Sequence, residues 1–426
     1  MNLGMAPGAI DASAVYYDVS KLKMVRGEGV YLFDELGQSY IDCASATFNL
    51  SLGYGHPAVL KAMREQAETL VHVTSSFQTD VINALCARLV ELAPSGMSRV
   101  HLKVSSGSAA NEGAIKMAQR ATGARDVITL FRSHHGQTTM TASMSGNAFR
   151  RAPLVDVHPG GLLIPDPYCK RCFYGQTPES CGLVCVDRID QFIEFASRGD
   201  VAAVMIEPIS GNGGNIVPPP GYFTALQAFC RERNIKLIMD EVQTAIGRTG
   251  RMFASEHFGV EPDAITLAKG LGGSGAQVAG IITTEELAGL PSSEHSFTYG
   301  SNLVAAAAGL ATLEIVSQES FLKNVRDTGD HIMRRLRASL GTCRNVFDIR
   351  GVGLMIGVEI VDDSGAPSST LTNHLANQAM EHGLILRTSR YGRGNVLKIR
   401  PPLILTIAEA DLICDRFEAL LATELS

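Results

Sequence analysis

Two short apolar runs within residues 236–274 constrain this chain most, because each ends abruptly near a polar residue that can do chemistry. The run at 236–239 is followed by Asp240, and the run at 264–267 is followed closely by Lys269 and a glycine-rich turn. Apolar runs of this length between turn signals predict buried β-strands. In an open α/β sheet, ligands bind just beyond the carboxyl ends of the strands. We therefore expect Asp240 and Lys269 to face one small molecule from two directions.

These two residue types suit one kind of chemistry. A lysine amine shifts its pKa readily when it is desolvated, and the neutral amine attacks carbonyl groups. A carboxylate beside a pyridine nitrogen keeps that nitrogen protonated, so that the ring can accept the electrons of a carbanion. One lysine and one aspartate would also fit an exposed loop with unrelated charges, so the flanking segments have to decide.

The flanking segments MDEVQTAIGRTG and LAKGLGG, together with the earlier SSGSAANEGAIKMA, resemble those of the class III aminotransferases. These are pyridoxal-phosphate (PLP) enzymes of fold type I. Several motifs in the right order are more specific than any one of them, and matching segments extend from about Tyr31 to Leu403. The resemblance and the alternation of strand and helix patterns predict an α/β fold. We expect a mainly parallel, doubly wound sheet in a large domain and a smaller α+β domain beside it.

The resemblance also implies roles for individual residues at the cofactor. Lys269 would carry PLP as an internal aldimine, and Asp240 would pair with the pyridine nitrogen. Gln243 would hydrogen-bond the ring hydroxyl, and Val242 would pack on one face of the ring. Glu207, which belongs to a Glu-Pro pair at the end of another apolar run, would lie near the same hydroxyl.

A predicted strand at 100–104 leads into small residues and then a helical pattern. This order of strand, glycine-rich turn and helix points backbone N–H groups at an anion. We assign Gly107 and Ser108 to the PLP phosphate, although the motif alone would also fit an ordinary tight turn. In EHSFTYGSN, Thr298 matches a family threonine that reaches the partner's phosphate. The resemblance therefore implies a homodimer with Thr298 contributed across the interface.

His134 stands where the family usually has an aromatic residue that stacks on the pyridine ring, and His135 and a glycine follow it. Imidazole can stack, but it can also change its charge near neutral pH. We assign His134 to the cofactor, whereas His135 could equally be a buried structural residue.

The substrate-binding positions depart most from the family pattern. In VLKIRPPL, Lys398 has the place of the usual carboxylate-binding arginine, and Arg400 lies on the same face of a strand. Gln137 and Asn212 replace an arginine and a glutamate that let relatives alternate between a terminal amine and 2-oxoglutarate. We assign Phe48, Lys398 and Arg400 to the substrate. The alternatives are that Phe48 only packs a loop and that Lys398 is a solvated strand residue.

Composition narrows the partners and the location. A formal charge of −6 without a Lys/Arg run argues against a nucleic-acid surface. No apolar run approaches the roughly 20 residues that span a bilayer, so no membrane contact is expected. Nine cysteines without a visible secretory signal predict a reducing, cytoplasmic location. Four of them have a spacing that could close around zinc, but we favour reduced thiols and assign no metal: Cys169, Cys172, Cys181 and Cys185.

A length of 426 residues permits one large core and a smaller companion domain. We expect residues 1–72 to form an N-terminal arm and a segment that joins the small domain. Residues 73–302 would form the large PLP-binding domain, and 303–426 the C-terminal small domain. The expected activity moves an amino group from an amine or amino acid to a keto acid through the Lys269 aldimine. A phospholyase, a racemase or epimerase, and a decarboxylase share the first step and remain alternatives.

Overall fold

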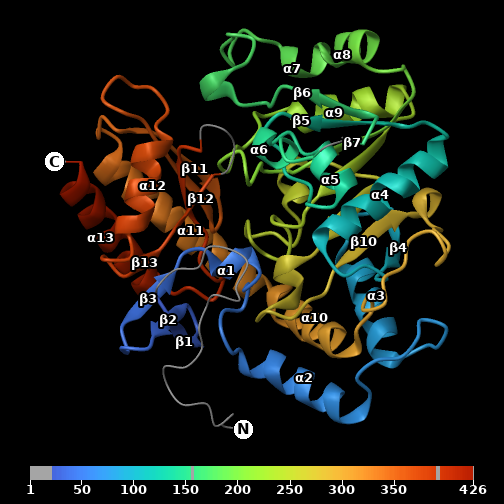
Figure 1. Ribbon diagram of the computed structural model, residues 1–426, viewed down its shortest axis with the longest axis horizontal. Coiled ribbons are helices and arrows are strands. Elements are labelled where there is room, and N and C mark those ends of the chain that lie inside the picture. The colour runs from blue at the N-terminus through green and yellow to red at the C-terminus, as the bar shows by residue number, and fades with distance from the viewer. Residues whose placement is uncertain (1–21, 155–157, 390–393, 426) are drawn as a thin grey trace.

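The computed structural model describes residues 22–154, 158–389 and 394–425. Its largest sheet has seven strands in the order β4-β10-β9-β8-β7-β5-β6. Figure 1 labels β4, β5, β6, β7 and β10 of this sheet. The strands are β4 (Met97–His101), β5 (Asp126–Leu130), β6 (Gly161–Ile164), β7 (Val201–Ile206), β8 (Lys236–Asp240), β9 (Ala264–Leu267) and β10 (Gly280–Thr284). Five neighbouring strands, in the order β6, β5, β7, β8 and β9, pair in parallel. β10 is antiparallel to both of its neighbours, β9 and β4. The expected mainly parallel sheet is confirmed.

Every residue of β5, β7, β8 and β9 is buried, so both faces of the central part of the sheet are covered, and this explains why β7 and β9 read as continuous apolar runs. In β7, Ala203 and Met205 pack in one hydrophobic cluster with helix α4 (Gly107–Thr122). Val204 and Ile206 pack in the other cluster, which includes helix α9 (Tyr222–Glu232). The sheet is therefore doubly wound, as the sequence predicts.

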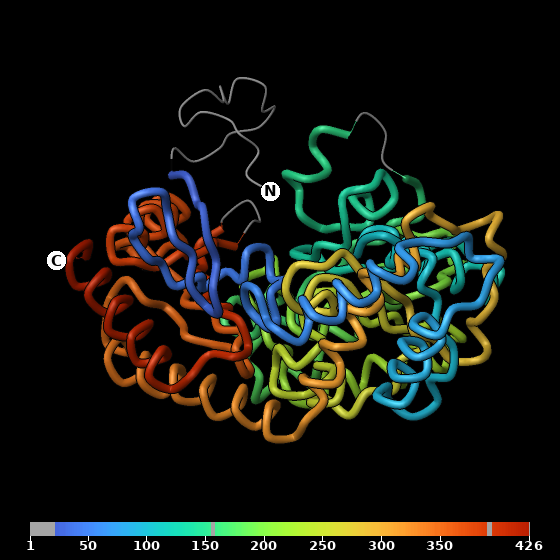
Figure 2. The backbone as a smooth tube through the Cα atoms, turned by 90° about the horizontal axis from the view of Figure 1, so that it is seen from below, coloured from blue at the N-terminus to red at the C-terminus, as the bar shows by residue number. Residues whose placement is uncertain are grey.

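A second core joins the two ends of the chain. The N-terminal strands β1 (Met24–Glu28), β2 (Tyr31–Asp34) and β3 (Ser39–Asp42) form one sheet with β13 (Leu384–Ile385), which lies parallel to β3. A further sheet has the order β11-β12-β15-β14. Its strands are β11 (Val346–Val352), β12 (Met355–Ile360), β15 (Val396–Ile399) and β14 (Arg387–Thr388). Figure 2 shows the N-terminal strands in blue beside helix α13 (Ile407–Glu424) in red. The domain boundaries after residues 72 and 302 stay predictions, and the predicted arm at residues 1–20 lies outside the described residues.

Long helices cover the sheets and connect the two cores. Asn302 caps α10 (Leu303–Val316), because its Oδ1 accepts a hydrogen bond from the Ala305 N–H at 2.9 Å. α10 packs against α2 (Pro57–Thr69) and α3 (Asp80–Leu92). The remaining helices are α1 (Ser45–Phe48), α5 (Thr139–Met144), α6 (Ala148–Arg151), α7 (Val184–Asp187), α8 (Ile189–Ala196), α11 (Glu319–Leu340) and α12 (Ser369–Gln378). Among the described residues, no helix has the length and apolar character needed to cross a membrane.

One strand differs from its prediction in a way that affects the site. The sequence predicts a strand at 100–104, whereas β4 ends at His101, which is the last residue of its ladder with β10. Beyond it, Val104 packs in the cluster with α4. The chain therefore leaves the sheet three residues early and has room to turn into the α4 N-terminus.

Candidate active site

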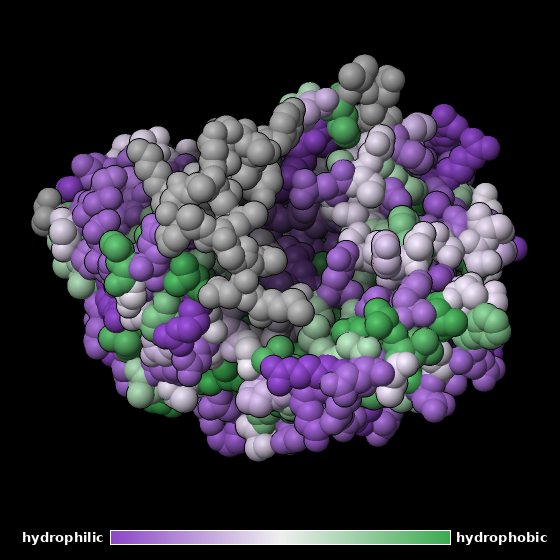
Figure 3. Space-filling view, turned by 60° about the horizontal axis from the view of Figure 1, so that its bottom comes forward, coloured by the Kyte–Doolittle hydropathy of each residue, from purple (hydrophilic) through white to green (hydrophobic). Residues whose placement is uncertain are grey.

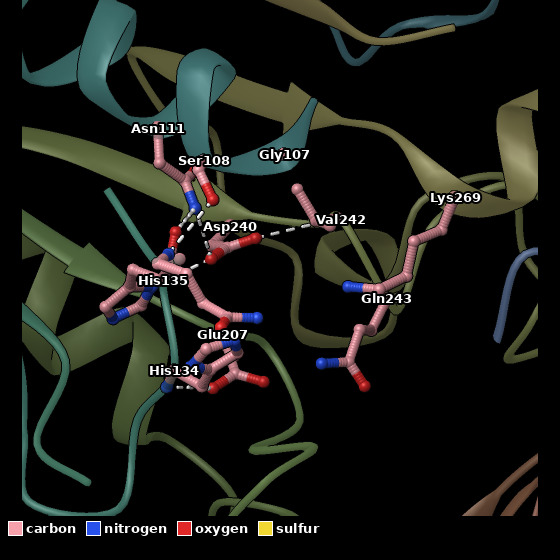
Figure 4. Close-up of a pocket in the computed structure, with 12 residues that line it drawn as sticks. Gly107, Ser108, Asn111, His134, His135, Glu207, Asp240, Val242, Gln243 and Lys269 are labelled. Carbon is pink, nitrogen blue, oxygen red and sulfur yellow. Dashed lines mark hydrogen bonds and ion pairs between the residues drawn. The ribbon is translucent and has the colours of Figure 1, made fainter. Parts of the chain in front are cut away.

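A cavity of about 200 Å³ opens where β7, β8 and β9 end and α4 begins (Figure 4). Its lining residues are Gly107, Ser108, Asn111, His134, His135, Gly136, Gln137, Glu207, Asp240, Val242, Gln243 and Lys269. Of the residues predicted to bind the cofactor, only Thr298 is not among them. Figure 3 shows a hollow lined by hydrophilic residues on the face turned to the viewer.

Lys269 directs its amine into this cavity from the end of β9 (Figure 4). Its backbone φ is +42°, in the left-handed region that a residue with a side chain rarely adopts. Burial lowers the pKa of the amine to about 8, although the charges of Asp240 and Glu207 oppose this shift. A substantial fraction of the amine is therefore neutral near physiological pH and able to attack a carbonyl.

Asp240, the last residue of β8, is buried and tightly held. Its Oδ2 lies 2.8 Å from His135 Nδ1 and accepts a hydrogen bond from Asn111 Nδ2 at 2.8 Å. Burial acts to raise the pKa of the Asp240 carboxyl, but hydrogen bonding and charge from His135, with the charge of Lys269, hold it below its usual value. Because an ionised carboxylate only accepts, His135 Nδ1 donates. His135 is thus a partner of Asp240 as well as a buried residue.

Asn111 is the site residue that sequence reasoning missed. Its Oδ1 accepts a hydrogen bond from Thr266 Oγ1 at 2.6 Å, which turns its Nδ2 toward Asp240. Asn111 follows Gly107 by four residues on α4, so both lie on the same face of that helix. That spacing was the available signal, but nothing in the sequence shows that this face meets β8.

The N-terminus of α4 is built to receive an anion. Ser106 caps the helix through a 3.2 Å hydrogen bond from the Ala109 N–H to its Oγ. The N–H groups of Gly107 and Ser108, in the first turn, have no acceptor within the helix. A Cβ on Gly107 would lie 2.8 Å from Val242 Cγ1, so only glycine leaves the space open. These residues fit a phosphate group.

His134 and Glu207 form another part of the cavity wall. The backbone N–H of His134 donates to Glu207 Oε1 at 3.1 Å. Burial lowers the pKa of the His134 imidazole to about 3, so the ring is uncharged at neutral pH. Its Nδ1 is buried without a hydrogen-bond partner in the described structure. Burial, with the charge of Asp240, raises the pKa of the Glu207 carboxyl.

The three residues assigned to the substrate lie together but outside the cavity lining. Lys398 Nζ lies 5.4 Å and Arg400 Cζ 4.3 Å from the centre of the Phe48 ring. Lys398 is only 3% exposed, so it is not a solvated strand residue. Gln137 lines the cavity and accepts a 2.8 Å hydrogen bond from Arg150, a nearby cation that the sequence did not single out.

The four clustered cysteines line a second cavity of about 20 Å³, away from the first: Cys169, Cys172, Cys181 and Cys185. All four thiols are free. Within residues 22–154, 158–389 and 394–425, no group of three or more His, Cys, Asp or Glu side chains is arranged to hold a metal ion. The zinc alternative has no support there.

A fold-type-I architecture with a lysine, an aspartate and an anion-binding helix N-terminus around one cavity defines a PLP enzyme. The model of the family described as aminotransferase class-III matches residues 12–421. The chain belongs to the class III aminotransferase family. Its cofactor is PLP, and the cavity residues fit that cofactor.

Known relatives differ in their reactions. A leucine/methionine racemase of Thermococcus litoralis is 36% identical over 96% of this chain and 92% of its own length. An acetylornithine aminotransferase of Methanothermobacter thermautotrophicus is 34% identical over 94% of this chain and 93% of its own length. The crystal structure of the omega transaminase from Pseudomonas jessenii in complex with PMP superposes with a TM-score of 0.87, at 31% identity, covering 95% of this chain and 92% of that one.

Proposed function

We propose that this transaminase moves an amino group from an amine or amino acid to a keto acid, with Lys269 and Asp240 as its catalytic residues. One observation carries the assignment. Asp240 ends β8, Lys269 follows the neighbouring strand β9, and both line the cavity at the N-terminus of α4. A buried lysine amine and an ionised aspartate therefore act on one bound molecule.

Each residue has a defined task. When bound, PLP supplies a pyridine ring that takes up the electron pair left when a bond at the substrate carbon breaks. Lys269 Nζ would act as the general base that takes the proton from the substrate carbon and as the acid that gives it back. Asp240 would hold the pyridine nitrogen in its protonated form, and the Gly107 and Ser108 N–H groups would hold the phosphate. His134 and Val242, which line the cavity, would pack against the ring.

The experiment that tests this function is a keto-acid dependence assay. The protein loaded with PLP is incubated with candidate amines and amino acids, with and without pyruvate. We expect an amino acid to form from the keto acid at the expense of the amine. No amino transfer with any donor would contradict the proposal.

A racemase is the second candidate, because the relative from Thermococcus litoralis carries that activity at 36% identity. Racemisation returns the proton to the opposite face of the same carbon and consumes no keto acid. Formation of the D-enantiomer from L-leucine without pyruvate would move the assignment to a racemase. Release of phosphate or of CO₂ from the donor would move it to a phospholyase or a decarboxylase.

Uptake of PLP by the apoprotein is expected to accelerate as the pH rises through about 8. The pKa of Lys269 is about 8, and only the neutral amine attacks the cofactor's carbonyl. The rate is measured by absorbance between pH 6.5 and pH 9.5. His134→Phe is the matched control and should keep the profile, because His134, with a pKa of about 3, is already neutral. A rate that is flat with pH would contradict the role of Lys269.

We propose that Lys398, beside Phe48, binds a carboxylate or phosphate of the substrate. Its support is a buried cation with an aromatic neighbour. Lys398→Met keeps the bulk and removes the charge. Since one charged hydrogen bond contributes about 1.5–3 kcal/mol, the KM for anionic amines should rise about ten- to a hundredfold, and that for uncharged amines should not change. Equal effects on both classes would make Lys398 structural. We also expect 2-oxoglutarate to be a poorer acceptor than pyruvate.

We propose a homodimer in which Thr298 reaches the partner's phosphate. Thr298 is exposed and absent from this chain's own cavity. Beside it, Tyr299 is 71% exposed and its ring lies 5.9 Å from that of His72. Apolar Val71 and Phe77, close in sequence to His72, are 55% and 66% exposed. Sedimentation should give twice the monomer mass, and a fully active monomer would exclude this arrangement.

The cytoplasmic location stays a proposal. Its support is that all nine cysteines are free, which is typical of a reducing compartment.

A further inference from the structure

Arg400 has a fixed set of partners at the edge of the cavity. It follows β15 directly and is 1% exposed. Its Nη1 donates to Gln243 Oε1 at 2.7 Å. Its Nη2 donates to the Gly211 carbonyl at 2.9 Å and also to Asn215 Oδ1. Both terminal nitrogens of the guanidinium are therefore held by protein oxygens.

The contact with Arg400 decides which way the Gln243 amide points. A guanidinium has five N–H donors and no acceptor. The Gln243 atom that faces it must therefore be the oxygen, and Nε2 is left on the other side. Figure 4 shows that nitrogen turned toward Glu207 and His134, and the oxygen turned away from them. Gln243 thus presents a donor, and not an acceptor, to the cavity that it lines.

The chain makes room for this contact at Gly211. A Cβ on Gly211 would lie 2.7 Å from Gln243 Oε1 and 3.1 Å from Glu207 Oε2. A second buried arginine from the same sheet, Arg350 of β11, binds the same loop, since its Nε donates to the Gly214 carbonyl at 2.9 Å. Arg350 has no hydrogen bond to Gln243 among those of the described residues. The two arginines hold one loop, and only Arg400 reaches the cavity wall.

We propose that Arg400 is a positioning residue, which fixes the Gln243 side chain so that Nε2 donates a hydrogen bond to the ring oxygen of the bound cofactor. This rests on the proposed function and on the family resemblance, which implies that Gln243 lies at that oxygen. It replaces the direct substrate contact that the sequence predicted for Arg400, because both terminal nitrogens of the guanidinium are engaged within the protein. A donor at the ring oxygen stabilises its anionic form and strengthens PLP binding.

The test is a double-mutant cycle on PLP affinity, measured by equilibrium dialysis of the apoprotein without substrate. Arg400→Met and Gln243→Ala should each weaken PLP binding about tenfold, which corresponds to the loss of one hydrogen bond to a charged group. The double variant should bind PLP about as well as Gln243→Ala alone, because both changes remove the same interaction. If the double variant binds PLP about a hundredfold more weakly than the wild type, so that the two single effects multiply, the proposal is overturned.

A second readout separates positioning from a general loss of structure. The pH midpoint of the bound cofactor's absorbance should move upward in Arg400→Met and in Gln243→Glu, since each leaves the ring oxygen without its donor. Arg350→Lys is the matched control: it perturbs the same loop at Gly214 and should leave both the affinity and the midpoint unchanged. A midpoint that moves equally in Arg350→Lys would also overturn the proposal.

Arg400→Lys is a second variant for use if Arg400→Met does not fold. It keeps the positive charge but lacks the two terminal nitrogens that donate to Gln243 and Gly211. It should weaken PLP binding in the wild-type background and have no effect beside Gln243→Ala. Wild-type protein that binds no PLP would contradict the proposed function itself. PLP binding with independent Arg400 and Gln243 effects would contradict only this inference.

Discussion

Lys269→Ala is expected to lower turnover by more than about 10⁴-fold. The change removes the amine that holds the cofactor and also the group that moves the proton, and general acid–base catalysis alone typically contributes about 10²–10⁴-fold. PLP should still bind without a covalent bond, because Asp240, Gly107 and Ser108 remain in the cavity lining. Borohydride reduction followed by peptide mapping should label Lys269 in the wild type and give no covalent label in the variant.

The matched control is Lys236→Met, which removes another buried lysine from the neighbouring strand. Lys236 is 6% exposed and lies at the opposite end of β8 from Asp240, where it pairs with Glu286 at 2.6 Å. The Lys236→Met variant should keep near-normal turnover, even if its melting temperature is lower. A borohydride label on a lysine other than Lys269, or turnover retained in Lys269→Ala, would refute the mechanism.

Asp240→Asn is expected to slow the single-turnover half-reaction about a hundredfold. Losing one charge-assisted contact in a dry site costs on the order of 3 kcal/mol. Asn111 Nδ2 and His135 Nδ1 both contact Asp240 Oδ2 as hydrogen-bond donors. The side-chain amide that Asp240→Asn introduces carries an NH₂ group, so one of its orientations would place a donor against these two donors. The rate of loss of the cofactor's absorbance on adding substrate measures the effect. A near-normal rate would show that protonation of the pyridine nitrogen does not depend on Asp240.

Glu241→Gln provides the control for Asp240→Asn, because it alters the adjacent buried carboxylate. Glu241 accepts hydrogen bonds from the Ala254 and Ser255 N–H groups at 2.7 and 2.9 Å and does not line the cavity. Glu241→Gln should lower the melting temperature of the protein and leave the rate of the half-reaction within a few fold of the wild-type rate.

The sequence predicted the parts of the site that depend on local pattern. Asp240 and Lys269 stand at strand ends, and Gly107 and Ser108 open a helix, so periodicity and turn residues place them. The parallel sheet follows from the alternation of strand and helix. These features depend on neighbours a few residues apart, which a single sequence displays.

The contacts that orient these residues could not be predicted, because they join distant segments. Asn111 lies 129 positions from Asp240, and Arg400 lies 157 positions from Gln243. The strand period puts Arg400 on the same face as Lys398, but the partners of its guanidinium lie on Gln243 and the Gly211 loop, which that period does not show. The strand predicted at 100–104 was displaced for a similar reason, since its end is set by pairing with β10.

The joining of the two chain ends has a consequence for biosynthesis. The Leu403 N–H donates to the Ser51 carbonyl at 2.8 Å, and Ser51 Oγ donates to the Gly270 carbonyl at 2.6 Å, directly after Lys269. β3 likewise pairs with β13, near the end of the chain. On the ribosome, β1, β2 and β3 can pair with one another as they emerge, but the outer edge of β3 and the Ser51 carbonyl lack their partners until almost the whole polypeptide has been made. Long-range pairing of this kind is slow to form, so a chain terminated shortly before β15 would contain every residue that lines the cavity but would lack the Leu403 contact to Ser51 and the Arg400 contact to Gln243.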